Sequence, residues 1–111
     1  MKLKALIPSL REKKRYVAFE IQTEKKLEFD EAKKSVESSI KEFLGDLGMA
    51  RSGIIFMKDW KDNKGIIKVN TNFVDEIKAS LALIKDVNQN KAKVRSLLVS
   101  GSIDKVRSGC F

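Results

Sequence analysis

The chain has 111 residues, of which 42% are hydrophobic, and it carries a formal net charge of +8. This length and composition predict a single domain over residues 1–111 and exclude a disordered chain or a repeat array. The sequence has no histidine and one cysteine, Cys110, so we expect no metal centre, no histidine-dependent catalysis and no intramolecular disulfide. No hydrophobic run approaches membrane-spanning length, which predicts a cytoplasmic protein without a membrane partner.

The first predicted element is a strand over "YVAFEIQ", residues 16–22, which follows a basic run at residues 11–15. Residue types alternate along it, as they do in a strand with two unlike faces. One face carries Val17, Phe19 and Ile21, and the other carries Tyr16, Ala18 and Glu20.

A helix is predicted over "FDEAKKSVESSIKEFLGDLG", residues 29–48, because its apolar residues recur at helical spacing. Asp30 is the expected N-cap, and Gly45 or Gly48 is expected to end the helix. The apolar stripe comprises Ala32, Val36, Ile40, Phe43, Leu44 and Leu47.

The second half of the chain predicts a hairpin, a helix and a last strand. "GIIFMKDW" and "GIIKVN" flank the polar "KDNK", which places a turn near Asp62 and Asn63. A second amphipathic helix follows over "NFVDEIKASLALIKDV", residues 72–87, capped by Thr71 or Asn72. "KVRSLLVSGSI", residues 93–103, is the last strand, and "DKVRSGCF" adds one helical turn.

The predicted order is βαββαβ, which indicates an α+β fold of the ferredoxin-like type that RNA-recognition motifs also adopt. In this fold two helices cover one face of a four-stranded antiparallel sheet. The first and last strands are antiparallel neighbours, so the start of each lies beside the end of the other.

The excess positive charge lies at the two ends of the chain. Residues 1–15 hold six basic and one acidic side chain, residues 91–111 hold five and one, and residues 16–90 hold twelve and thirteen. This segregation favours a polyanionic partner, nucleic acid before a membrane, over a merely solvated basic surface. The predicted RNA-binding residues are Arg11, Lys13, Lys14, Arg15, Lys105 and Arg107 at one end of the sheet, and Lys25, Lys26, Lys91, Lys93 and Arg95 at the other.

The third predicted strand lacks the aromatic residues with which RNA-recognition motifs stack on bases. In "KGIIKVN" the corresponding positions carry Ile66 and Lys68. Contacts between cations and phosphates of structured RNA or DNA are therefore expected instead of base stacking.

A protein-binding surface is also predicted on the sheet. Tyr16, Phe56 and Ile66 would form an apolar patch that the two helices leave open, suited to a partner protein or a second copy of this chain. Trp60 is assigned either to the core or to the same interface. The carboxylates Glu20, Asp59, Asp75 and Glu76 show no spacing that demands a metal site or an acid/base pair.

Several stretches together resemble one family. "LIPSLREKKRYVAFEI", "GIIKVN" followed by "VDEIKASLALI", and "VRSLLVSGSIDK" are similar to the Pop-five family of ribonuclease P proteins, whose archaeal members are called protein component 2. The resemblance covers nearly the whole chain in order, and it implies the same βαββαβ fold without base-stacking rings.

The resemblance implies an accessory subunit that is not an enzyme on its own. Its partners would be the catalytic RNA of ribonuclease P and a second protein, component 3. Magnesium would be used by the RNA, which removes the 5′ leader from precursor tRNA, and no cofactor would be bound by the protein.

Three alternatives remain open at this point. An acylphosphatase-like hydrolase of the same fold would need a phosphate-cradling loop, but "TEKKLEFD", residues 23–30, lacks the glycines for one. A protein-interaction or regulatory module of ferredoxin-like fold would dimerise independently of RNA. A ribosomal-type RNA-binding protein would share the charge pattern.

Overall fold

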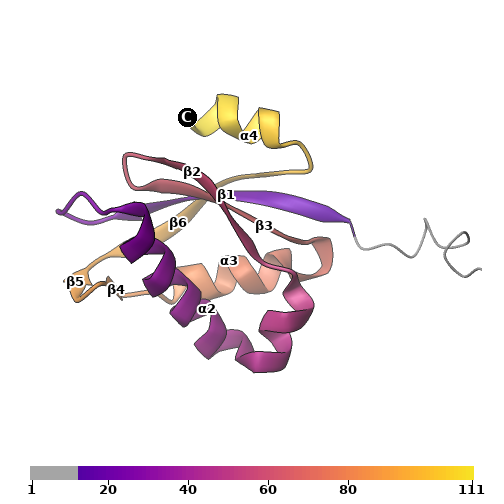
Figure 1. Ribbon diagram of the computed structural model, residues 1–111, viewed down its shortest axis with the longest axis horizontal. Helices are drawn as coiled ribbons and strands as arrows, with labels where there is room; N and C mark the ends of the chain where they lie inside the picture. Colours follow the sequence, from indigo (N-terminus) through magenta and orange to yellow (C-terminus); the bar gives the residue numbers. More distant parts are fainter. Residues whose placement is uncertain (1–12) are drawn as a thin grey trace, which may run out of the picture.

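Four long strands form one antiparallel sheet in the computed structural model, which describes residues 13–111 (Figure 1). They are β1 (Lys14–Gln22), β2 (Ile55–Lys61), β3 (Lys64–Asn70) and β6 (Lys93–Ser100), in the order β2-β3-β1-β6. Helices α2 (Phe29–Ser52) and α3 (Val74–Ala82) cover one face, and α4 (Ile103–Cys110) lies on the other. The remaining elements are the 3-10 helix η2 (Thr71–Phe73) and the short strands β4 (Asp86–Val87) and β5 (Asn90–Lys91).

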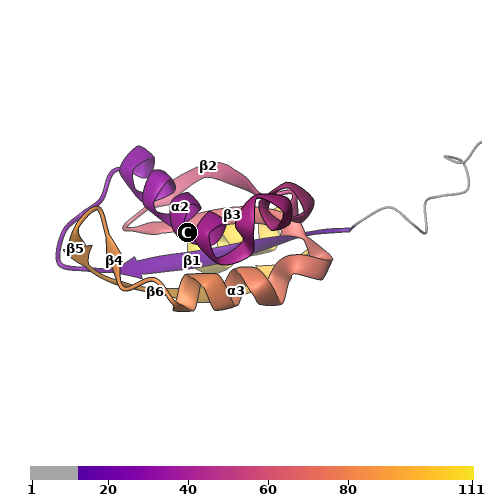
Figure 2. The same cartoon turned by 90° about the horizontal axis from the view of Figure 1, so that it is seen from below.

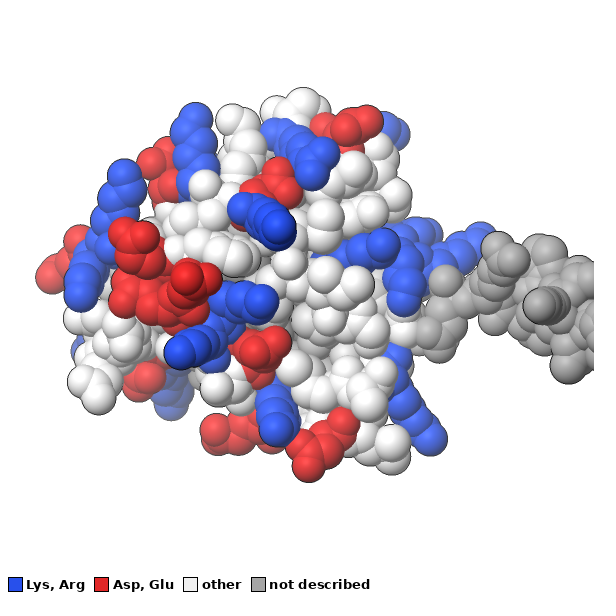
Figure 3. Space-filling model, viewed as in Figure 1, with Lys and Arg blue, Asp and Glu red and all other residues white. Residues whose placement is uncertain are grey.

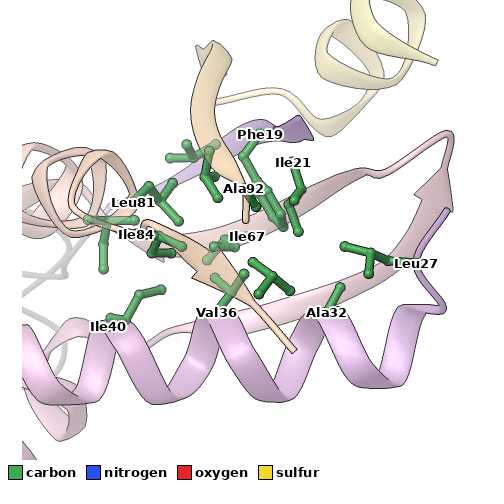
Figure 4. Packing of buried hydrophobic residues seen from close by; sticks show 14 of the residues in the cluster. Phe19, Ile21, Leu27, Ala32, Val36, Ile40, Ile67, Leu81, Ile84 and Ala92 are labelled. Atoms are coloured by element: carbon green, nitrogen blue, oxygen red, sulfur yellow. The ribbon is translucent and has the colours of Figure 1, made fainter. Parts of the chain in front are cut away.

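The two faces of β1 are those that its alternation predicted. Val17, Phe19 and Ile21 are at most 2% exposed and belong to the core between the sheet and helices α2 and α3 (Figure 4). Ala18 points to the opposite face, where it packs with α4. The prediction for this strand is confirmed, because successive side chains of a strand point to opposite faces of its sheet.

The turn between β2 and β3 also lies where it was predicted. Asp62 and Asn63 both have positive φ, 51° and 61°, a conformation that Asp and Asn tolerate better than most residues. The Asn63 side chain accepts a hydrogen bond from the Leu27 backbone N–H (2.8 Å) and donates one to the Lys25 carbonyl (3.0 Å). This residue therefore ties the hairpin to the loop between β1 and α2.

Helix α2 differs from its prediction at both ends. Its N-cap is Glu28 and not Asp30, because the Glu31 carboxylate accepts a hydrogen bond from the Glu28 N–H (3.0 Å) in a capping box. Gly45 does not end the helix but kinks it, with φ 78° and ψ 172°, and the helix continues to Ser52. Gly53, at φ 63°, supplies the left-handed residue that ends it.

The kink changes which apolar residues of α2 reach the core. The residues before it, Ala32, Val36 and Ile40, are at most 1% exposed, as predicted. Phe43 and Leu47, on either side of Gly45, are 46% and 64% exposed. The predicted stripe is wrong for these two residues, because it assumed a straight helix.

Helix α3 ends at Ala82, five residues earlier than predicted, and the chain then forms the β4–β5 hairpin. Its turn residues Asn88 and Gln89 have φ of 51° and 69°. Asn88 binds α2 twice: its N–H donates to the Ser35 hydroxyl (3.0 Å), and its side chain donates to the Glu31 carboxylate (2.7 Å). Figure 2 shows the hairpin at the end of the sheet where β1 finishes.

The C-terminal segment forms an eight-residue helix where one turn was predicted. Val106 of this helix is 0% exposed and packs on Ala18 and Ile66. The predicted open patch is therefore wrong: Ile66 is 1% exposed beneath α4, while Phe56 lies on the other face and packs edge-on against Phe19. Between residues 13 and 111, the structure contains no helix long and apolar enough to cross a membrane.

Candidate nucleic-acid interface

The pairing of β1 with β6 places the predicted basic residues on and next to these strands at two ends of the sheet, whereas Lys105 and Arg107 lie on α4, which packs on the open face. Tyr16 lies opposite Ser100, and Gln22 lies opposite Lys93. The start of β1 therefore lies at the end of β6, and its end lies at the start of β6. Figure 3 shows basic side chains gathered where the described chain begins, whereas the visible face toward the opposite end mixes both signs of charge.

At the first end, Lys14 belongs to a hydrogen-bond network that joins three elements. Its ammonium group donates to the Asn70 side-chain oxygen at the end of β3, and the Asn70 amide donates to the Arg51 carbonyl in the last turn of α2 (2.8 Å). Asn70 is 3% exposed. Lys14 therefore stabilises the fold, whatever else it binds.

The residues next to Lys14 in the sequence, Lys13 and Arg15, differ in the contacts that their side chains make. Arg15 donates from Nη1 to the Lys14 carbonyl (3.0 Å) and lies beside Gly101, where an added Cβ would be 3.3 Å from Nη1. The Lys13 side chain is exposed, and the Lys13 carbonyl accepts hydrogen bonds from the Thr71 N–H and hydroxyl. Arg11, also a predicted RNA-binding residue, lies outside the described residues.

Lys14→Ala is expected to lower the free energy of unfolding by about 1–3 kcal/mol, because it removes a charged hydrogen bond to a buried side chain, that of Asn70. Lys13→Ala removes the same charge from the adjacent exposed position and is expected to change stability by less than about 0.5 kcal/mol. Urea denaturation of the two variants measures the difference. Equal stabilities would show that the Lys14 network contributes nothing to the fold.

At the second end, the structure forms a groove with a volume of about 1280 Å³. We call it the basic groove. Its walls carry five cations and one carboxylate, Glu24, and its floor is made of small and aliphatic residues. The cations are Lys25, Lys85, Lys91, Lys93 and Arg95; the floor consists of the buried residues Ile84, Ala92 and Val94, and the exposed Ala82 also lines the groove.

Most of the residues predicted at this end do meet in the groove. Lys26 does not line it, and Lys85, which does, was not predicted. The predicted second helix includes Lys85; the signal that identifies a turn here instead is the polar, turn-forming "KDVNQN". The shared location is confirmed, whereas contact with RNA stays a prediction for every one of these residues.

Three hydrogen bonds hold the walls of the basic groove. Asn63 fixes the loop that carries Lys25, through the Lys25 carbonyl. The Thr23 hydroxyl donates to the Lys91 carbonyl (2.8 Å), and the Ala92 N–H donates to the Lys85 carbonyl (3.0 Å). All three bonds use lysine backbone carbonyls, and within residues 13–111 the side chains of these lysines form no hydrogen bond or ion pair.

Arg95 and Arg107, the two arginines predicted to bind RNA in the C-terminal part of the chain, both form ion pairs. Arg95 lies 3.1 Å from Glu20, and an exposed pair of this kind stabilises a protein by about 1 kcal/mol or less, so a phosphate can replace the carboxylate. Arg107 lies 2.9 Å from Asp59 on β2, and this hydrogen bond raises the pKa of Arg107 above its ordinary value. Arg107 thereby links α4 to the sheet. Lys105 is exposed in the first turn of α4.

The sheet face that stacks bases in RNA-recognition motifs is covered here. Helix α4 packs on Ala18 and Ile66, and the Lys68 ammonium lies 5.9 Å from the centre of the Tyr16 ring. Trp60 lies on the other face, where it packs near Phe19 and donates to the Leu27 carbonyl (3.0 Å). No group of three or more His, Cys, Asp or Glu side chains suited to a metal ion occurs in residues 13–111.

Comparisons with known proteins identify the family. The model of the Rpp14/Pop5 family matches residues 15–110. The chain is 38% identical over 107 residues to ribonuclease P protein component 2 of Thermococcus gammatolerans, covering 96% of this chain and 89% of that protein. Against the protein of the same name from Pyrococcus furiosus, identity is 38% over 105 residues, covering 94% and 88%.

A solved structure shares the fold. A chain in the cryo-EM structure of yeast ribonuclease MRP superposes with a TM-score of 0.68 at 15% sequence identity, covering 89% of this chain and 92% of that one. With the family match over residues 15–110, this agrees with the resemblance read from the sequence. The chain belongs to the Rpp14/Pop5 family.

Proposed function

We propose that this chain is a protein subunit of ribonuclease P that binds the RNA of the enzyme and supports removal of the 5′ leader from precursor tRNA. The observation that carries the proposal is its 38% identity, over nearly its full length, to two archaeal proteins named ribonuclease P protein component 2. The cations at the two ends of the sheet are the groups that would neutralise RNA phosphates.

The proposed role is accessory. Folded RNA brings phosphates close together, and lysine and arginine side chains between them offset the repulsion and reduce the magnesium ion concentration that the RNA needs. Catalysis would remain with the RNA and its magnesium ions, in the cytoplasm. For the fold, the strand order β2-β3-β1-β6 with α2 and α3 on one face supports a ferredoxin-like assignment.

The proposed protein partner is component 3, with a second copy of this chain as the alternative. Large hydrophobic side chains exposed on the surface support a protein partner. They include Phe43 and Leu47 beside the kink of α2, and Ile55, 54% exposed, at the start of the edge strand β2. Of the interface residues predicted from the sequence, Tyr16, Phe56 and Trp60 are partly exposed, and Ile66 is buried.

The proposed function is tested by cleavage of precursor tRNA with the catalytic RNA and component 3, with and without this chain, over a range of magnesium concentrations. We expect the chain to lower the magnesium concentration needed for half-maximal cleavage. An unrelated basic protein of equal charge is the control for nonspecific neutralisation.

Unchanged magnesium dependence, together with no salt-sensitive binding to the RNA, would overturn the proposal. Dimerisation that does not weaken as salt is added, in a chain with no affinity for RNA, would instead indicate a protein-interaction or regulatory module. Turnover of a phosphoester by the isolated chain would indicate a hydrolase.

A further inference from the structure

We infer that the basic groove is a binding site for the sugar–phosphate backbone of one unpaired RNA strand. This inference rests on the proposed function and adds to it the place on the protein and the form of RNA bound there.

Charge is the first reason to assign the groove to a polyanion. Five cations and one carboxylate line it, and the carboxylate that pairs with Arg95, Glu20, lies outside the lining. A concave surface with one dominant sign of charge concentrates counter-ions more strongly than a flat surface does. Lysines, which make up four of the five cations, bind phosphates as point charges and do not require one fixed geometry.

The composition of the floor indicates which part of the RNA enters. None of the described residues that line the groove is aromatic, so bases have no ring on which to stack. The floor residues Ile84, Ala92 and Val94 are 5–6% exposed and present only small apolar surfaces. Such a floor fits riboses between phosphates, and it predicts binding that depends little on base sequence.

The size of the groove favours a single strand over a duplex. Its volume of about 1280 Å³ exceeds the range of about 300–1,000 Å³ typical of sites for drug-sized ligands, which leaves room for a short strand. An A-form duplex is a wide, rigid body whose phosphates would meet only the rim. An unpaired strand can bend into the groove and place several phosphates near its cations.

The other end of the sheet is less suited to this role. There Lys14 is committed to Asn70, and Arg15 binds the adjacent backbone. In the basic groove, hydrogen bonds of Asn63, Thr23 and Ala92 hold the walls through backbone carbonyls and leave the lysine side chains available. Walls held in this way reduce the entropy lost on binding.

Fluorescence anisotropy with labelled hexauridylate tests the inference between 50 and 200 mM salt. The groove variant carries Lys85→Gln, Lys91→Gln and Lys93→Gln, which remove three charges without touching the backbone bonds. Since each phosphate contact on a single strand contributes about 0.7 to the log–log salt slope, we expect the slope to fall by about 2 and the affinity at 0.1 M salt to fall roughly 10- to 100-fold.

A matched control carries Lys34→Gln, Lys58→Gln and Lys78→Gln, three exposed lysines outside the groove lining that give the same change in net charge. We expect this variant to lose less than about threefold in affinity. Equal losses in the two triple variants would overturn the inference and leave only a diffuse basic surface.

A third variant, Ala82→Leu, fills part of the groove and keeps every charge. Ala82 is exposed at the end of α3, so the fold should tolerate the change, which circular dichroism checks. We expect weaker hexauridylate binding with an unchanged basic surface. Binding equal to that of the unmodified chain would overturn the assignment of the strand to the groove itself.

Two further measurements separate the inference from its rivals and from the proposed function. Hexaglutamate peptide is expected to bind at least tenfold more weakly than hexauridylate; equal binding would overturn the inference in favour of an acidic protein segment. If the unmodified chain supports cleavage of precursor tRNA while the groove variant binds hexauridylate normally, the inference fails and the function stands. If the unmodified chain neither binds RNA nor supports cleavage, the proposed function fails.

Discussion

Val106→Asp is expected to detach α4 from the sheet and to lower the free energy of unfolding by about 3–5 kcal/mol. The side chain is 0% exposed and packs with Ala18 and Ile66, so a carboxylate at this position would be removed from water among apolar side chains. Undocking avoids burial of the charge but exposes these three apolar side chains, and full burial of a Val or Ile side chain contributes about 1.5–3 kcal/mol.

Urea denaturation and limited proteolysis measure this effect. We expect earlier unfolding and rapid cleavage in the C-terminal segment, with the rest of the sheet still folded at low urea. Ser108→Asp adds the same charge to an exposed position of α4 and is expected to cost less than about 1 kcal/mol. If the two variants unfold at the same urea concentration, α4 does not depend on Val106 for its position.

The elements that the sequence predicted best are those with long, regular periodicity. The alternation of β1, the stripe of Ala32, Val36 and Ile40, and the Asp62–Asn63 turn each depend on local spacing, and all three are confirmed. Helix α4 was underestimated because its apolar residues Ile103, Val106 and Cys110 are few and the prediction assigned the first of them to the preceding strand.

Misses in the fold have tertiary causes. The kink at Gly45 exposes Phe43 and Leu47, although a helical stripe alone places both in the core. The β4–β5 hairpin interrupts the predicted second helix because Asn88 binds Ser35 and Glu31 on α2, a contact between segments more than fifty residues apart. Gly45 and the turn-forming "KDVNQN" are local signals for both interruptions, but the path of the chain after each depends on tertiary contacts.

At the candidate site, the predicted strand topology located the basic residues better than sequence motifs did. Antiparallel pairing of the first and last strands placed Lys25 near Lys91, Lys93 and Arg95, and the structure brings these residues to one groove. The structural role of Lys14 was missed, because it depends on the register that brings Lys14 opposite Asn70.

Phe19→Ala is expected to lower the free energy of unfolding by about 3–5 kcal/mol, a large part of the roughly 5–15 kcal/mol that stabilises a typical domain. Phe19 is 2% exposed, and its ring centroid lies 6.5 Å from that of Phe56 and 6.4 Å from that of Trp60. A Cβ added to Gly65 would lie 2.8 Å from the Phe19 ring, so the cavity is closed on the β3 side by backbone that cannot collapse easily.

Phe19→Ala should also loosen the loop that contributes Lys25 to the basic groove. Trp60, which Phe19 supports, donates to the Leu27 carbonyl in the loop that carries Lys25. In Phe19→Ala we therefore expect faster hydrogen exchange at the Leu27 N–H, which donates to Asn63, along with unfolding at a lower urea concentration.

Phe43→Ala removes the same ring from a position where it is 46% exposed. This control is expected to lower the free energy of unfolding by less than about 1 kcal/mol, with Leu27 exchange unchanged. Equal costs at the two positions would mean that the ring of Phe19 is not part of the packed core, and unchanged Leu27 exchange in Phe19→Ala would separate the core from the groove.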